Sequence, residues 1–106
     1  MQGRRKCPRR RCATNTTLAV VATNARLTKE QANKVAQLAH DGLARVIAPV
    51  HTLFDGDTIF ALSVGDAKAN MLSLGAASVQ AVAESVKRAV RLARGVGGIP
   101  GLADMA

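Results

Sequence analysis

The chain has 106 residues, of which 48% are hydrophobic and only 2% aromatic, and its formal net charge is +8 at neutral pH. This length allows a single small domain, and the shortage of aromatic residues predicts an aliphatic core. No apolar run is long enough to cross a bilayer, and no apolar stretch follows the basic start as in a secretory signal peptide. We therefore expect a cytoplasmic protein that does not bind a membrane.

The excess positive charge is concentrated in the first residues of the chain. Beyond residue 12, nine basic residues face seven acidic ones, which leaves only +2. We therefore predict that residues 1–14 form a basic disordered tail that binds phosphate weakly and in a salt-dependent manner. Nucleic-acid binding is not expected as the main function, because the chain has no aromatic platform for bases and no base-reading motif. The tail holds six of the fifteen basic residues: Arg4, Arg5, Lys6, Arg9, Arg10 and Arg11.

The cysteines and histidines do not form a metal-binding pattern. Cys7 and Cys12 both lie in the basic tail, while His40 and His51 stand far away without paired spacing. A structural zinc site needs about four ligands at closer spacing. We therefore expect two reduced thiols and no metal ion.

The first half of the chain predicts a strand followed by a helix. Residues 16–23 are apolar and rich in β-branched side chains, as in a strand that is covered on both faces. Thr28 and Gln31 form a capping-box pattern at the start of a helix, and Pro49 ends it. The apolar stripe of this helix is expected to contain Ala32, Val35, Ala36, Ala39, Leu43, Val46 and Ile47.

The second half repeats this order. An Asp-Gly pair predicts a turn before a strand over residues 58–64, which Gly65 ends. Residues 66–75 are expected to be a loop with some helical character, and residues 76–94 a helix with Gly95 as its C-cap. Residues 96–106 are Gly-rich and are expected to be flexible. The basic residues near the end of this helix would meet the negative end of its dipole: Lys87, Arg88, Arg91 and Arg94.

The predicted fold is α/β, in the order strand, helix, strand, helix. Two strands that are apolar on both faces need cover on both sides, and a two-stranded sheet is marginal by itself. Two Ala-rich helices cover only one face. We therefore expect the chain to pack against further protein: another subunit, the other half of a precursor, or a symmetry mate.

Hydroxyl and carboxyl side chains stand just before each predicted strand. Thr16 and Thr17 precede the first, and Asp55 and Asp57 precede the second. A threonine becomes a useful nucleophile when its own free α-amine, with a pKa of about 8, serves as the base. Cutting the Asn15–Thr16 bond would supply that amine, and the two aspartates could hold the ammonium or the hydroxyl in place.

The same residues also have a structural interpretation. Asn and Thr favour turns and strand starts, and Asp-Gly-Asp is more often a turn than a catalytic pair. His51 lies four residues before Asp55 and could approach the site, while His40 is expected on the helix near Asp41. For both histidines, a partly exposed structural role is favoured over a catalytic one.

Two longer stretches resemble a known family. The segments "NTTLAVVATNARLTKEQANKVAQLAHDGLARVI" and "HTLFDGDTIFALS" are similar to the small subunit of the DmpA-type aminopeptidases and of the nylon-oligomer (6-aminohexanoate oligomer) hydrolases. The resemblance runs from about Asn15 to Val64 and, more loosely, to Arg94. It makes residues 15–95 a small-subunit region.

The resemblance implies a precursor that cuts itself into a large and a small subunit. Thr16 would be the N-terminal nucleophile, with Thr17 as the alternative, and Asp55 and Asp57 would assist it. Amide hydrolysis would pass through an acyl-enzyme ester without a metal or organic cofactor. The implied fold is a four-layer α-β-β-α sandwich like that of N-terminal-nucleophile hydrolases. Short peptides or amino-acid oligomers would be the substrates, and paired subunits would assemble into a homo-oligomer.

The resemblance covers the small subunit alone. In the family, the large subunit supplies a lysine and an asparagine that assist catalysis, and residues 1–14 do not resemble the end of that subunit. We therefore expect the chain to be incomplete without the large subunit and inactive alone. The second interpretation is a degenerate, non-catalytic, basic interaction protein.

Overall fold

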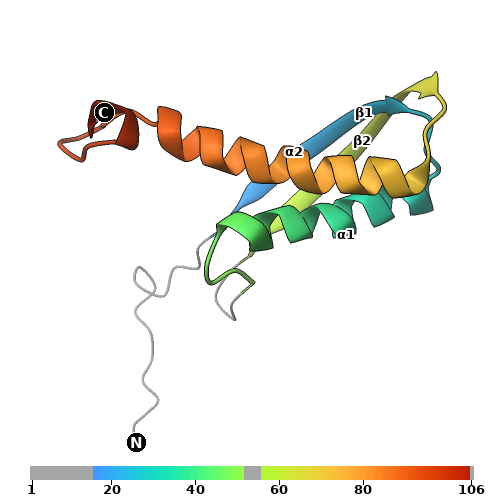
Figure 1. The fold of residues 1–106 in the computed structure, drawn as a ribbon, viewed down its shortest axis with the longest axis horizontal. Helices are drawn as coiled ribbons and strands as arrows, with labels where there is room; N and C mark the ends of the chain where they lie inside the picture. Colours follow the sequence, from blue (N-terminus) through green and yellow to red (C-terminus); the bar gives the residue numbers. More distant parts are fainter. Residues whose placement is uncertain (1–15, 52–55, 106) are drawn as a thin grey trace, which may run out of the picture.

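The computed structural model describes residues 16–51 and 56–105. The described residues form two strands, two α-helices and a short C-terminal 3₁₀ helix, and Figure 1 shows their arrangement. The order strand, helix, strand, helix confirms the predicted α/β fold, which is compatible with a part of an N-terminal-nucleophile hydrolase sandwich. In chain order the elements are β1 (Leu18–Ala25), α1 (Lys29–Val46), β2 (Thr58–Ala67), α2 (Met71–Leu92) and the 3₁₀ helix η1 (Leu102–Met105).

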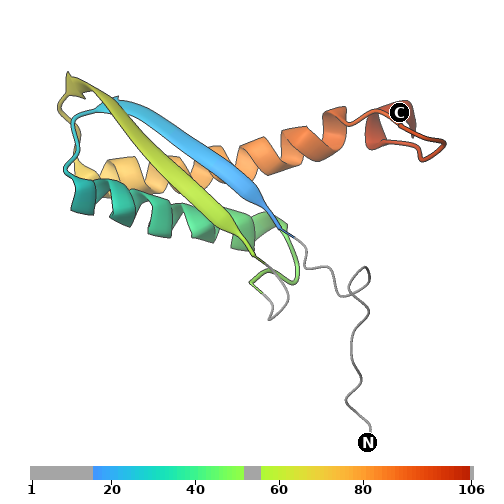
Figure 2. The same ribbon diagram turned by 180° about the vertical axis from the view of Figure 1, so that it is seen from behind.

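The two strands form a parallel sheet, and both helices lie against one of its faces. Leu18 pairs with Thr58 at one end of the sheet and Ala25 with Ala67 at the other. Parallel strands need a long crossover connection, which α1 provides. Figure 2 shows the opposite face of the sheet, which none of the helices in the described residues covers.

The core lies between the helices and the covered face of the sheet. Its side chains come from both helices and from the covered face of the sheet, and Val35 and Leu43 are fully buried. The helices approach closely at Gly42, where an added Cβ would lie 2.9 Å from the Val82 Cβ. The buried hydrophobic residues are Ala25, Val35, Ala39, Leu43, Ile59, Val79, Val82 and Ala83.

The capping box at the start of α1 is confirmed. The Gln31 N–H donates to the Thr28 hydroxyl oxygen at 3.2 Å, and the Thr28 N–H donates to Gln31 Oε1 at 2.9 Å. The helix ends at Val46, three residues before Pro49. Both ends of this helix therefore follow from local chemistry.

The predicted limits of the strands were wrong by a few residues. The first strand begins at Leu18, two residues later than expected, and the second continues through Gly65 to Ala67. Gly65 has a φ of 137° and lies against the other strand, where the register shifts. A Cβ at this position would be 2.6 Å from the Asn24 carbonyl oxygen. The glycine therefore permits a close approach within the sheet and does not end the strand.

The predicted start and end of the last helix were also wrong. Helix α2 begins at Met71, because Asn70 is an N-cap whose Oδ1 accepts from Leu72 N at 2.8 Å and Ser73 N at 3.2 Å. The helix ends at Leu92, with Ala93 as its C-cap. The Gly95 N–H instead donates to the carboxylate of Asp104. The flexibility expected of residues 96–106 stays a prediction.

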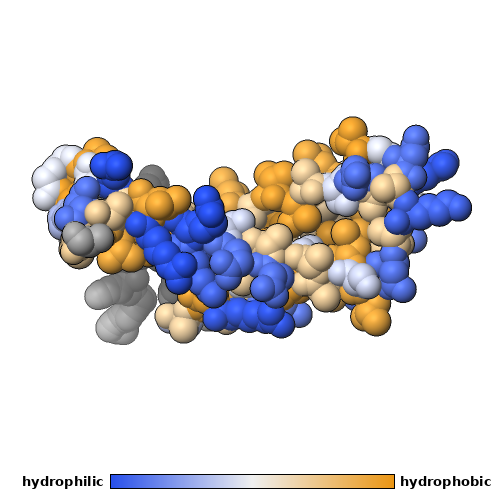
Figure 3. Space-filling model, turned by 45° about the horizontal axis from the view of Figure 1, so that its top comes forward, coloured by the Kyte–Doolittle hydropathy of each residue, from blue (hydrophilic) through white to orange (hydrophobic). Residues whose placement is uncertain are grey.

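The uncovered face of the sheet is apolar. Covered and exposed side chains alternate along β1 and along β2 from Ile59 to Val64, as strand geometry requires. Figure 3 views the molecule from the side of the helices and shows apolar patches beside a hydrophilic band there, while the uncovered sheet face is turned away. We call the exposed residues of this sheet face the open face: Leu18 (71% exposed), Val20 (62%), Phe60 (57%), Leu62 (50%) and Val64 (75%).

Candidate functional site

The parallel register brings the starts of the two strands to the same edge of the sheet. Because Leu18 pairs with Thr58, the residues just before β1 lie opposite those just before β2. The Thr58 N–H donates to the Thr17 carbonyl oxygen at 2.9 Å, which extends the ladder by one step. Two segments about forty residues apart in the chain therefore meet at this edge.

Asp57 binds the backbone that leads into β1. Its Oδ1 accepts a hydrogen bond from the Thr17 N–H at 3.2 Å, and its side chain is only 5% exposed. Within the described residues, no hydrogen bond joins Asp57 to the Thr16 side chain. Asp57 was predicted to hold the ammonium or hydroxyl group of Thr16. In the structure it accepts a hydrogen bond from the backbone N–H of the next residue, Thr17.

Thr16 is exposed and lies beside the turn before β2. A Cβ added to Gly56 would stand 3.4 Å from the Thr16 Oγ1. The candidate nucleophile and the Gly56–Asp57 step are therefore neighbours. Asn15 and Asp55 lie outside the described residues, as does the tail with its two cysteines.

The imidazole of His51, for which a structural role was expected, also lies at this edge of the sheet. Its Nδ1 lies 3.2 Å from Asp57 Oδ2, and its side chain is 43% exposed. The His51 ring also lies against the His40 ring, with centroids 5.1 Å apart. The sequence signal was the closeness of His51 to the two aspartates, but spacing alone does not reveal a contact.

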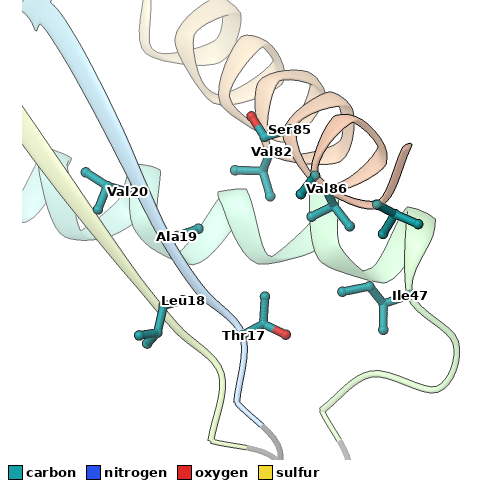
Figure 4. Close-up of a pocket in the computed structure, with 10 residues that line it drawn as sticks. Thr17, Leu18, Ala19, Val20, Ile47, Val82, Ser85 and Val86 are labelled. Carbon is teal, nitrogen blue, oxygen red and sulfur yellow. The ribbon is translucent and has the colours of Figure 1, made fainter. Parts of the chain in front are cut away.

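An apolar groove begins beside the site, between β1 and the second half of α2. The volume of this groove is about 430 Å³. Figure 4 shows that the Thr17 side chain points to the same side of β1 as that of Ala19, whereas the Leu18 side chain points to the other side. Apart from Thr17 and Ser85, its walls are apolar, so it suits an aliphatic group. The lining residues are Thr17, Leu18, Ala19, Val20, Ile47, Val82, Ser85, Val86, Ala89 and Val90.

The described part of the chain contains no group of three or more His, Cys, Asp and Glu side chains that could hold a metal ion. Over residues 16–51 and 56–105, no helix is both long and apolar enough to span a membrane.

Comparison with known proteins identifies similar sequences. The sequence model of peptidase family S58 matches residues 2–103, and thus extends into the basic tail. The chain is 42% identical over 103 residues to an uncharacterised aminopeptidase of Mycobacterium leprae (83% of this chain) and 38% identical over 106 residues to one of Mycobacterium tuberculosis (86% of this chain). It is 33% identical over 82 residues (70% of this chain) to a 6-aminohexanoate-oligomer endohydrolase of Paenarthrobacter ureafaciens.

These relatives are much longer than the matched region. The chain spans 28% of the Mycobacterium leprae protein, 31% of the Mycobacterium tuberculosis protein and 23% of the endohydrolase. The similarity therefore concerns one part of each relative.

Proposed function

Because this chain belongs to peptidase family S58, we propose that it is the nucleophile-bearing part of a self-processing amide hydrolase. The observation that carries the proposal is the meeting of Thr16 and Thr17 with Gly56 and Asp57 at one edge of the sheet. An N-terminal threonine nucleophile uses its own α-amine as the base, and the bond from Thr17 N–H to Asp57 would hold the backbone beside that residue in place.

In the proposed mechanism, the precursor is first cut between Asn15 and Thr16. The freed α-amine of Thr16 then takes the proton of its own hydroxyl as Oγ1 attacks the carbonyl carbon of an amide. The amine of the substrate leaves with a proton, and an ester on Thr16 remains. Water hydrolyses that ester, which releases the acid and restores the hydroxyl.

The aspartates would support this chemistry from the start of β2. Asp57 would fix the backbone at Thr17, so that the nucleophile one residue earlier has a defined position. We propose Asp55 as the second supporting carboxylate. The reaction needs no metal or organic cofactor, since the threonine supplies both nucleophile and base.

The partner in this proposal is the large subunit of the same precursor. The relatives are more than three times as long as the region that they share with this chain, and the open face is an apolar surface that a second sheet would cover. The four layers of an α-β-β-α sandwich would then be complete. The paired subunits would form a homo-oligomer, and the substrates would be short peptides or amino-acid oligomers.

The test is a substitution in the enzyme assembled with its large subunit. Thr16→Ala removes the hydroxyl and is expected to abolish both self-cleavage and turnover of an amino-acid anilide. Thr16→Ser keeps a hydroxyl and is expected to retain both. Mass spectrometry should find a mature chain that starts at Thr16. A Thr16→Ala enzyme that is still cut and still active would overturn the proposal.

A second nucleophile is favoured by one contact. The Thr17 nitrogen lies 3.2 Å from Asp57 Oδ1, so a cut one residue later would place a new ammonium group beside that carboxylate. The mass of the mature chain distinguishes the two cases, because loss of Thr16 lowers it by one threonine residue. Thr17→Ala would then be the inactivating change.

A further inference from the structure

We propose that His51 is a positioning residue that orients the Asp57 carboxylate and, through it, holds the backbone beside the nucleophile. The catalytic meaning of this inference rests on the proposed function, whereas the link from His51 to Asp57 to Thr17 is a property of the folded chain.

The two oxygens of Asp57 have different surroundings. Oδ1 accepts the Thr17 N–H, whereas Oδ2 is buried and has no hydrogen bond of regular geometry from the described residues. The His51 Nδ1 lies 3.2 Å from Oδ2, close enough for an electrostatic contact and for a hydrogen bond after a small rotation of the ring. A buried carboxylate oxygen without a donor is costly, so His51 is the group that this oxygen needs.

The backbone of His51 limits which substitutions can test its side chain. Its φ is 57°, in the left-handed region that glycine adopts readily and in which Asn, Asp and His are the most frequent other residues. A variant that tests the imidazole must therefore accept this backbone conformation.

The imidazole is held from the other side by helix α1. The His40 ring lies 5.1 Å from that of His51, with an angle of 55° between the planes. The contacts thus run from α1 through His51 and Asp57 to the start of β1. Without the imidazole, the carboxylate would be free to turn towards water and release the Thr17 amide.

The experiment compares two variants that both accept a positive φ. His51→Gly removes the side chain, whereas His51→Asn keeps an N–H donor attached to Cγ, near the position of the histidine Nδ1. The readout is the hydrogen-exchange rate of the Thr17 amide, measured by NMR on the full chain labelled with ¹⁵N-threonine. The amide of Thr23 in β1 is the internal control for general loosening.

We expect His51→Gly to speed exchange at Thr17 by about tenfold while exchange at Thr23 stays within about twofold of the wild type. His51→Asn is expected to restore slow exchange at Thr17. Equal exchange rates at Thr17 in the wild type and both variants would overturn the inference. An equal acceleration of Thr17 exchange in the two variants would overturn it as well.

The assembled enzyme gives a second readout. There, His51→Gly should lower kcat with little change in KM, because the nucleophile is displaced and the substrate pocket is not. His51→Asn should recover most of kcat. If the Thr17 exchange result holds while the wild-type enzyme hydrolyses no amide, the proposed function fails and the positioning role stands.

Discussion

At the scale of single residues, the unusual group is Asp57, a nearly buried carboxylate with no Lys or Arg partner among the described residues. Its Oδ1 accepts the Thr17 N–H, and the His51 Nδ1 lies 3.2 Å from its Oδ2. Hydrogen bonds to a charged acceptor are stronger than neutral ones, so the bond to Thr17 is expected to fix the start of the strand. The carboxylate is therefore placed to fix the backbone next to Thr16, the candidate nucleophile.

The contribution of this hydrogen bond can be measured by substitution. Asp57→Ala leaves the Thr17 N–H without its acceptor and is expected to lower the free energy of unfolding by about 1–3 kcal/mol. Asp57→Asn keeps an oxygen acceptor, so its free energy of unfolding should fall clearly less. Urea unfolding of the three proteins provides the comparison. Equal losses in the two variants would mean that the bond to Thr17 contributes nothing.

The sequence predicted part of this site. Thr16, Thr17 and Asp57 were selected from residue type and from their places before two strands, and the parallel register does bring them to one edge. The His51 contact was not predicted, because it depends on a left-handed backbone that neighbouring residues do not indicate. The spacing of residues in the sequence predicts which side chains are neighbours along one strand, but not which side chains meet across a turn.

At the scale of elements, the apolar stripe of α1 was predicted correctly, whereas the start of α2 was not and its stripe was correct only in part. Of the residues expected to be buried on α2, Val79, Val82 and Ala83 are buried, but Ala89, Val90 and Ala93 are exposed.

Residues 66–75 were expected to be a loop with some helical character, whereas the helix already begins at Met71. Gly75 is buried inside this helix, where an added Cβ would meet the Leu38 side chain at 2.7 Å. A glycine that permits close helix packing and one that breaks a helix look alike in a sequence, because the difference lies in a distant residue.

Gly42 provides a test of this close packing. A Cβ there would lie 2.5 Å from the Val79 carbonyl oxygen, which belongs to backbone that cannot easily move. We expect Gly42→Ala to destabilise the fold by about 1–3 kcal/mol through overpacking, more than the gain of up to about 1 kcal/mol from replacing a helical glycine. Urea unfolding measures the net change.

The matched control is the neighbouring exposed position on the same helix. Asp41→Ala adds no atoms to the helix contact and is expected to change stability by less than about 0.5 kcal/mol. If Gly42→Ala were as stable as this control or more so, the close approach of α1 and α2 would be incorrect.

At the scale of the whole molecule, the two-stranded sheet is apolar on both faces, but the helices of the described residues cover only one of them. Parallel sheets are normally covered on both sides, and the open face exposes five large apolar side chains. The apolar pattern of the strands predicted two covered faces. This chain supplies the cover for one of them, and a sequence read alone does not tell which element covers the other.

The open face should therefore mediate association. We expect Phe60→Lys to weaken self-association of the isolated chain, and binding of the large subunit, by at least about tenfold, since burying one Phe contributes about 1.5–3 kcal/mol. Leu72→Lys is the control, because Leu72 is 83% exposed and belongs to α2, the helix that Figure 1 shows on the other side of the sheet from the open face. Sedimentation velocity measures both. Equal effects of the two changes would show that the open face is not the interface.

The ladder at the start of β1 has a consequence for a chain that is cut just before it. Thr17 is tied to the second strand twice, through its N–H to Asp57 and through its carbonyl oxygen to Thr58. New chain ends usually fray, and ordering them again costs conformational entropy. A break after residue 15 would leave only Thr16 beyond these two hydrogen bonds, so the new N-terminus would stay beside the start of the second strand without a further ordering step.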